Sequence, residues 1–181
     1  FYNYRERLDS EAQDISCDKK KGDFRLMAHQ QIIKDYMNVR TPYRGLLLYH
    51  GLGSGKSCAS INIAEGIKHD KRVVVMTPAS LRRNYVEELK FCGDKLYKKN
   101  QYWSFVSIIK KNGDLNTSLI QALSTALSIT TAFVRKHRGA WLMNGTKKRS
   151  NYSNLSAAEK QVLDAQLNEM IMSKYRFISY N

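Results

Sequence analysis

The sequence predicts an α/β fold in which a parallel sheet is flanked by helices, and three neighbouring segments carry this prediction. Two short apolar runs, residues 45–50 and 72–77, are typical of strands buried on both faces. Between them, residues 56–68 space their apolar side chains at roughly helical intervals. Strand, helix and strand within residues 45–77 have the size of a βαβ unit, whose strands are parallel.

In the first half of the chain, the sequence indicates where the domain and its helices begin and end. Residues 1–23 are polar and mixed in charge, so we expect a loop or linker there and a domain from residue 24 onward. Residues 26–37 have one apolar helical face, and this helix is expected to end at Thr41-Pro42 because a residue before proline disfavours the helical region. A further helix is expected to start at residues 78–80, with a stripe made of Leu81, Tyr85, Val86 and Leu89.

Beyond residue 91 the signals are weaker. The patterns predict a strand at 102–109, a turn at 112–114, one helix at 118–137 and a basic loop at 145–154. Ser156 and Glu159 form a capping box before a helix at 157–174, whose inward residues are expected to be Val162, Leu163, Leu167, Met170 and Ile171. A buried strand is expected at 176–180, after which the chain stops. Because the first residue is not Met and a domain seldom ends on a core strand, we expect a piece of a longer chain, cut within a domain.

The composition of the chain indicates which kinds of partner and which cellular environment to expect. Thirty Lys and Arg against sixteen Asp and Glu give a net charge of +14 and a pI near 9.7, which favours polyanionic partners such as nucleic acid. No apolar run reaches the roughly 18 residues of a membrane helix, and no secretory signal opens the chain, so no membrane partner is expected. Three cysteines (Cys17, Cys58 and Cys92) without a C-x-x-C pair indicate a reduced intracellular chain with neither a disulfide framework nor a metal site.

The most informative motif is a glycine-rich loop between the first predicted strand and helix. Glycines allow a backbone nest whose N–H groups point at phosphate oxygens, and the helix N-terminus adds positive potential. Lys56 is expected to reach the β- and γ-phosphates of ATP, and the Ser57 hydroxyl to ligate Mg²⁺, so these two are the candidate catalytic residues. The full candidate cofactor-binding loop is His50, Gly51, Leu52, Gly53, Ser54, Gly55, Lys56, Ser57 and Cys58. His50 replaces the usual first glycine. The alternative is a glycine-rich turn with an incidental lysine.

Residues 53–57 resemble motif I of superfamily 2 helicases and translocases, and the flanking sequence extends this resemblance. Leu26-x-x-His29-Gln30 is similar to the L-x-x-[YH]-Q signature of Swi/Snf-type ATPases, which implies that Gln30 reads the adenine edge; the alternative is a surface glutamine. Residues 75–84 resemble motif Ia, and residues 177–181 the start of motif Ib. The resemblance implies contacts to a nucleic-acid backbone by Thr77, Pro78, Ser80, Asn84, Ser179 and Asn181. Ser80 could instead be an ordinary helix N-cap.

Residues 42–57, 77–81 and 177–181 together are similar to the superfamily 2 ATPases of large nucleocytoplasmic DNA viruses. That group includes the small subunit of the poxvirus early transcription factor and the poxvirus transcription-termination nucleoside triphosphatase. The resemblance implies that residues 24–181 are a P-loop NTPase fold, a partial first RecA-like lobe. A helical insertion is expected at about 94–174, and motif II would lie after residue 181.

The resemblance also implies what the protein does. The full-length protein would be an ATP-dependent helicase or translocase acting in viral transcription or DNA processing. Its expected partners are a DNA or RNA backbone and viral RNA polymerase or transcription-factor subunits. It would be found in the virion and the host cytoplasm or nucleus. Phosphoryl transfer needs motif II and a second lobe, so this chain alone is expected to bind nucleotide weakly without useful turnover.

Two other readings remain open. The chain could be a non-enzymatic DNA-binding or transcription-complex subunit. No acidic residue occurs between Asp114 and Glu159, and the basic runs 135–138 and 147–149, with Trp141 and Tyr152 nearby, could form a binding patch; a solvated loop is the alternative. A nucleotide kinase or GTPase is the other reading. An N-K-x-D guanine signature and an arginine-rich lid are both missing, which disfavours it.

Overall fold

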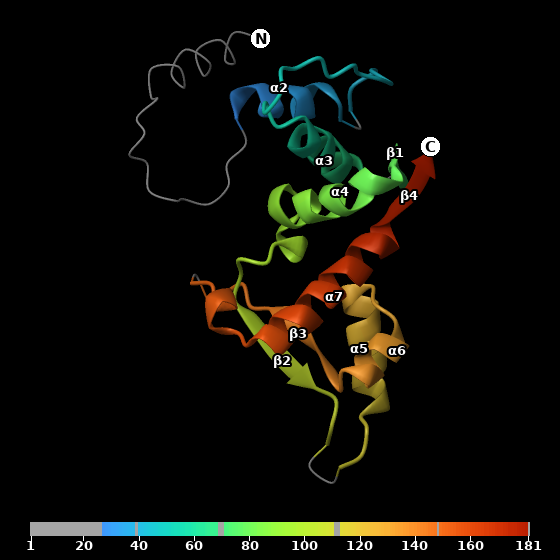
Figure 1. Ribbon diagram of the computed structural model, residues 1–181. Helices are drawn as coiled ribbons and strands as arrows, with labels where there is room; N and C mark the ends of the chain where they lie inside the picture. The colour runs from blue at the N-terminus through green and yellow to red at the C-terminus, as the bar shows by residue number, and fades with distance from the viewer. Residues whose placement is uncertain (1–26, 39, 69–70, 111–112, 148, 181) are drawn as a thin grey trace.

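The computed structural model describes residues 27–38, 40–68, 71–110, 113–147 and 149–180. These residues form a mixed α/β structure with two small sheets (Figure 1). The elements are α2 (Ala28–Tyr36), α3 (Lys56–Ile67), β1 (Val73–Pro78), α4 (Ala79–Cys92), β2 (Trp103–Ser107), α5 (Thr117–Leu127), α6 (Thr131–Lys136), β3 (Gly139–Met143), α7 (Ala157–Lys174) and β4 (Tyr175–Tyr180). The predicted polar segment 1–23 lies outside the described residues.

A parallel pair of strands, β1 and β4, forms the first sheet. The register runs from Val73 opposite Tyr175 to Pro78 opposite Tyr180. The predicted parallel sheet is therefore confirmed, but the predicted pairing is wrong, because residues 45–50 form no strand. Their side chains are largely exposed, with Leu47 at 86% and Tyr49 at 93%. An apolar run becomes a strand only when another strand supplies its hydrogen-bond partners, and no described strand lies beside this one.

Burial along β1 alternates, which shows that the described elements cover one face of this sheet. Val75 is buried, while its neighbours Val74 and Met76 are exposed. In β4 only Tyr175 is buried, and Ile178 and Tyr180 remain exposed. The strands were predicted at the right places, but the expected burial on both faces is wrong for the described chain.

Tyr175 links the start of β4 to helix α3. Its hydroxyl donates to Glu65 Oε1 at 2.7 Å, and Glu65 also pairs with Lys68, which contacts Asp94 at 2.8 Å. Burial, followed by the hydrogen bond to Glu65, raises the pKa of Tyr175 above its ordinary value. The hydroxyl therefore stays protonated and keeps donating, which holds α3 against the first sheet.

The second sheet is an antiparallel pair, in which Trp103 of β2 lies opposite Met143 of β3. The predicted strand at 102–109 is confirmed, whereas β3 was missed, although the short apolar run 140–143 was a usable signal. The single helix predicted at 118–137 is two helices. Ser128 adopts a left-handed conformation with φ 54° and ends α5, and the Thr130 side chain caps the start of α6 by accepting from Phe133 N–H.

Helix α7 passes β3 of the second sheet and leads directly into β4 of the first (Figure 1). The predicted capping box is confirmed, since the Ser156 and Glu159 side chains each bond the other residue's main chain. Leu163, Leu167, Met170 and Ile171 are buried as expected, and Val162 is half-buried. These residues belong to one apolar core that also includes side chains of α3, α4 and the second sheet. None of the described helices is both long and apolar enough to cross a membrane.

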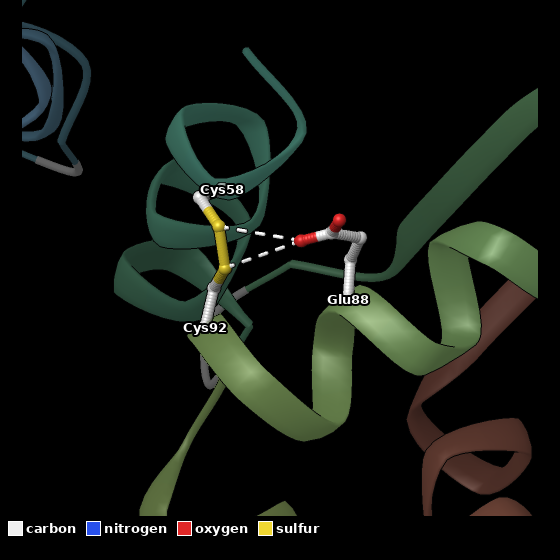
Figure 2. A group of neighbouring side chains, drawn as sticks. All are labelled: Cys58, Glu88 and Cys92. Atoms are coloured by element: carbon white, nitrogen blue, oxygen red, sulfur yellow. Dashed lines mark hydrogen bonds between the residues drawn. A yellow bond between two sulfur atoms is a disulfide. The ribbon is translucent and has the colours of Figure 1, made fainter. Parts of the chain in front are cut away.

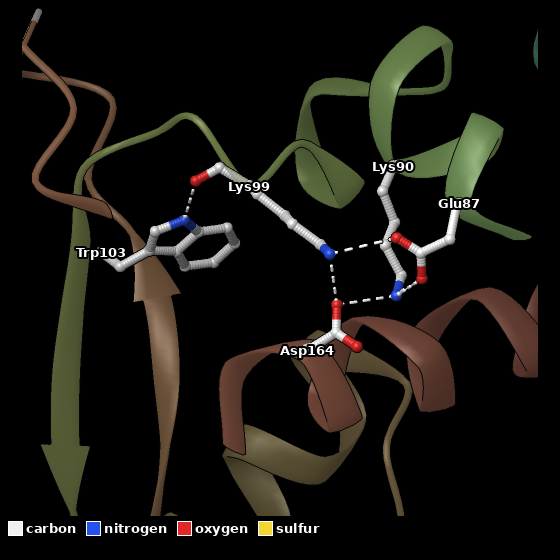
Figure 3. Close-up of polar contacts among 5 residues, drawn as sticks. All are labelled: Glu87, Lys90, Lys99, Trp103 and Asp164. Atoms are coloured by element: carbon white, nitrogen blue, oxygen red, sulfur yellow. Dashed lines mark hydrogen bonds and ion pairs between the residues drawn. The ribbon is translucent and has the colours of Figure 1, made fainter. Parts of the chain in front are cut away.

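A charged cluster joins α4 to α7 (Figure 3). The ammonium of Lys90, on a side chain only 2% exposed, lies 2.7 Å from Glu87 Oε1 and 2.8 Å from Asp164 Oδ1. Lys99 contacts Asp164 at 2.7 Å and Glu87 at 3.1 Å. Two cations thus share two carboxylates, so the buried ammonium of Lys90 is compensated.

Cys58 of α3 and Cys92 of α4 are joined by a disulfide, which corrects the expectation of a reduced chain without such bonds (Figure 2). The two residues are 34 positions apart, and the packing of α3 on α4 brings their Cα atoms to 5.4 Å. Short sequence spacings such as C-x-x-C could not reveal a pair formed by helix packing. Cys17 lies outside the described residues.

Candidate phosphate-binding site

The glycine-rich loop leads directly into the first turn of α3. Gly53 and Gly55 have φ angles of 79° and 75°, a region that glycine adopts at little cost. Gly55 is the N-cap, and the helix begins at Lys56. The first N–H groups of a helix have no intrahelical acceptor, so this helix start presents donors beside the loop. Lys56 and Ser57 are exposed, whereas Cys58 is buried and faces α4.

The side chain of Lys56 folds back over the loop. Its ammonium donates to the main-chain oxygens of His50 at 3.0 Å and Gly51 at 2.8 Å. The Ser54 hydroxyl also donates to Gly51 O, at 2.9 Å. These carbonyls are neutral acceptors, and a phosphate oxygen would be a stronger one for the same ammonium. The charge of Lys56 therefore lies against the main chain at the start of its own loop.

Helix α2 supports the loop through two neighbouring side chains. His29 Nε2 lies 3.0 Å from Ser54 O, and the His29 ring meets the His50 ring edge-on at 5.4 Å. Gln30 Nε2 donates to Gly55 O at 3.3 Å, while its Oε1 accepts from Met27 N–H at 3.1 Å. Gln30 is 2% exposed, so it is not a surface glutamine. The assignment of Gln30 to adenine stays a prediction, and it requires the amide to leave these main-chain partners.

Replacing Gly55 with alanine is expected to disrupt this loop and to lower stability by about 1–3 kcal/mol. A Cβ at Gly55 would lie 2.4 Å from Gln30 Nε2, on a backbone with φ 75° that side chains rarely adopt. Urea unfolding would measure the loss.

Gly66→Ala is the matched control for this substitution. Gly66 lies on the same helix, and nothing is within 4 Å of its added Cβ. Alanine there is expected to leave stability equal or raise it by up to about 1 kcal/mol, because alanine is the better helix former. Equal stabilities of the two variants would contradict the role assigned to the contact between Gly55 and Gln30.

The candidate nucleic-acid contacts gather at one end of the parallel strand pair. Thr77 of β1 lies opposite Ser179 of β4, and Pro78 ends β1. Ser80 and Asn84 are exposed on the first turns of α4. Pro78, not Ser80, is the N-cap of α4, which corrects the N-cap alternative considered for Ser80. Asn181 lies outside the described residues.

The two basic runs are not brought together. Residues 135–138 precede β3 and residues 147–149 follow it, so a whole strand separates them. Trp141, proposed as part of a patch, is 5% exposed and packs edge-on against Phe105 at 5.2 Å. Trp141 is therefore a packing residue and cannot take part in an exposed patch, whereas Tyr152, the other aromatic residue considered, is half-buried. Lys148 lies outside the described residues.

Glu88 is a residue that the sequence analysis did not single out. Its carboxylate lies beside Cys58 and Cys92, and once the two cysteines are reduced these three residues offer ligand atoms for a metal ion. Glu88 and Cys92 are four positions apart on α4, a spacing that was visible in the sequence. Cys58 comes from α3, and only the packing of the helices adds it.

Comparison with known proteins gives partial matches to viral helicases. The chain is 37% identical over 106 residues to a "Putative ATP-dependent RNA helicase" of Acanthamoeba polyphaga mimivirus, covering 58% of this chain and 18% of that protein. A second protein of that virus with the same name is 35% identical over 95 residues, which is 49% of this chain and 8% of the relative. The "Putative helicase" of Frog virus 3 is 35% identical over 87 residues, which is 45% of this chain and 9% of the relative.

The chain thus shares moderate identity with helicase-named proteins of large DNA viruses over about half of its length. It spans less than a fifth of the length of these relatives. No protein-family model matches it, and no solved structure matches it at a significant level.

Proposed function

We propose that this chain is the ATP-binding part of a nucleic-acid-dependent helicase or translocase. The observation that carries the proposal is the position of the Lys56 ammonium, which the loop holds between the oxygens of His50 and Gly51 at the start of α3. The helicase names of the viral relatives support it. In this proposal residues 24–181 belong to a first RecA-like lobe of the superfamily 2, Swi/Snf-like type, with residues 94–174 as an insertion.

Binding of ATP would exchange the partners of Lys56. Its ammonium leaves the two carbonyl oxygens and donates to the β- and γ-phosphates, while N–H groups at the start of α3 donate to phosphate oxygens. The Ser57 hydroxyl, exposed beside Lys56, is the residue that would hold Mg²⁺. When bound, Mg²⁺ would neutralise charge on the triphosphate.

The nucleic acid would lie across the end of the parallel strand pair. Thr77 and Ser179 are directly opposite each other there, and the exposed Ser80 is on the next helix. Hydroxyl groups and a helix start bind phosphate without reading bases, which suits a motor that moves along any sequence. DNA or RNA as the track, viral polymerase or transcription-factor partners, and the virion or host cell as the location belong to the proposal.

Lys56→Ala is the experiment that tests the phosphate site. We expect its affinity for a fluorescent ATP analogue with Mg²⁺ to fall at least about tenfold, because charge-assisted hydrogen bonds are each worth about 1.5–3 kcal/mol. In the full-length protein the same change should remove nucleic-acid-stimulated ATP hydrolysis.

Lys174→Ala is the matched control, since it removes the same charge from an exposed position in the last turn of α7. Its nucleotide affinity is expected to equal that of the unchanged chain. A Lys56→Ala variant that binds the analogue as tightly as Lys174→Ala would refute the site.

A further inference from the structure

The sulfur atoms of Cys58 and Cys92 share one carboxylate. Glu88 Oε2 lies 3.5 Å from Cys58 Sγ and 3.6 Å from Cys92 Sγ (Figure 2). Both cysteines are buried, at 7% and 3% exposure, whereas Glu88 is exposed. Glu88 precedes Cys92 by one turn of α4, so its carboxylate lies on the same face of that helix as the Cys92 sulfur.

The position of the Glu88 carboxylate affects the balance between the two thiols and the disulfide of Cys58 and Cys92. A carboxylate accepts hydrogen bonds from S–H groups, so Glu88 favours the two thiols. A disulfide has no proton to donate, and in that state the carboxylate faces sulfur lone pairs. The oxidised pair therefore loses two charge-assisted contacts that the reduced pair has, which makes this bond easier to reduce than one in apolar surroundings.

We propose that Cys58 and Cys92 form a reversible thiol–disulfide site beside the phosphate loop, which exchanges with small thiols and their disulfides. One protein thiolate attacks a sulfur of the small disulfide, and one small thiolate leaves. The second protein thiolate then attacks the protein sulfur of this mixed disulfide, forms the bond between Cys58 and Cys92, and releases the second small thiolate. The protein pair is oxidised, the small disulfide is reduced, and the two cysteine protons end on the released thiols.

The site couples to the phosphate loop through α3. Cys58 is two residues after Lys56, within the first turn of the helix, and the bond ties this turn to the end of α4. Lys56 must leave the oxygens of His50 and Gly51 before it can bind phosphate. Oxidation restrains the turn that carries Lys56, so the reduced chain binds nucleotide more tightly. This coupling rests on the proposed function.

The redox site is tested in a Cys17→Ser chain, where Cys58 and Cys92 are the remaining cysteines. The chain is equilibrated with mixtures of reduced and oxidised glutathione, free thiols are alkylated, and the products are weighed. We expect one reversible transition between a reduced form that carries two alkyl groups and an oxidised form that carries none, because its two sulfurs are bonded to each other. Glu88→Gln should move the equilibrium at least about threefold toward the disulfide, because the anionic acceptor is gone. Cys92→Ser cannot form the internal bond, and its one remaining thiol is found either alkylated or carrying one glutathione.

Three outcomes would overturn the redox site. The first is a chain that forms no internal disulfide at any glutathione ratio, and the second is a Glu88→Gln transition identical to that of the parent. The third is a reduced chain that retains one Zn²⁺ per molecule and thereby resists oxidation, because Cys58, Glu88 and Cys92 would then be metal ligands.

The coupling is tested by titrating the oxidised and reduced forms with the ATP analogue. We expect the oxidised form to bind at least about threefold more weakly, and the difference to vanish in Cys92→Ser, since that chain lacks the tether. Equal affinities, or binding by neither form, overturn the coupling. Binding by neither form also overturns the proposed function, while the mass measurements still decide the redox site.

Discussion

Replacing Gln166 with leucine is expected to lower the free energy of unfolding by about 2–6 kcal/mol. Gln166 is fully buried on α7, and its amide pairs with the main chain of Trp141 in β3. Its Oε1 accepts from Trp141 N–H at 2.8 Å, and its Nε2 donates to Trp141 O at 2.8 Å. Leucine has a similar volume but leaves both main-chain groups buried without these bonds, and each such group costs about 1–3 kcal/mol.

Gln161→Leu is the control, because Gln161 is exposed on the same helix. Its stability is expected to stay within about 0.5 kcal/mol of the parent. Urea unfolding followed by circular dichroism compares the two variants. If Gln166→Leu unfolds at the same urea concentration as Gln161→Leu, Gln166 does not hold β3 to α7 in the way described.

Replacing Asp164 with alanine is expected to cost about 2–3 kcal/mol at neutral pH. Loss of one partner from a buried ion pair typically costs about 3–5 kcal/mol, and Glu87 remains to compensate part of the Lys90 charge here. Lys90→Met removes the buried ammonium itself, and Asp164 and Glu87 still have Lys99. That variant should stay within about 1 kcal/mol of the parent, because an apolar side chain of similar size tolerates burial.

Acid should weaken the same cluster. Burial opposes the ionisation of Asp164, but the hydrogen bonds from Lys90 and Lys99 outweigh it and hold its pKa below the ordinary value. The same balance lowers the pKa of Glu87. A carboxyl with a lowered pKa in the folded state stabilises the fold above its ordinary pKa, and this contribution is lost as pH falls through the folded value.

Urea midpoints measured from neutral pH downward test this dependence. The parent is expected to lose stability below about pH 5, and Asp164→Ala should lose less over the same interval, because one of the two titrating partners is gone. Parallel curves for the two proteins would contradict the role of Asp164.

Much of the local structure could be predicted because its causes lie close together in the chain. The capping box of Ser156 and Glu159 starts α7 where expected, and the apolar runs that became β1 and β4 are where the patterns indicated. The helix after the glycine-rich loop also begins at the expected lysine, Lys56. In each case a few consecutive residues specify the backbone conformation.

The predictions of secondary structure failed where the conformation of a single residue, or pairing with a distant segment, determines the structure. Ser128 turns left-handed and splits one expected helix into two, which no apolar period reveals. Residues 45–50 have the composition of a strand but no described neighbour to pair with. The glycines followed by Lys56 and Ser57 indicated the candidate loop in the sequence. The hydrogen bonds of Gln30 with the main chain of Met27 and Gly55 were not visible there, because they depend on how α2 packs against the loop.

The sequence by itself determined the glycine-rich loop that leads into a helix, the mixed α/β composition and the boundaries of most elements, because these depend on neighbouring residues. Only the tertiary structure decided that β1 pairs with β4, that Lys90 is buried between two carboxylates, and that Cys58 meets Cys92 beside Glu88. These contacts join residues far apart in the chain. Such residues meet only after the helices and strands have packed around their common core, which is why sequence spacing did not reveal them.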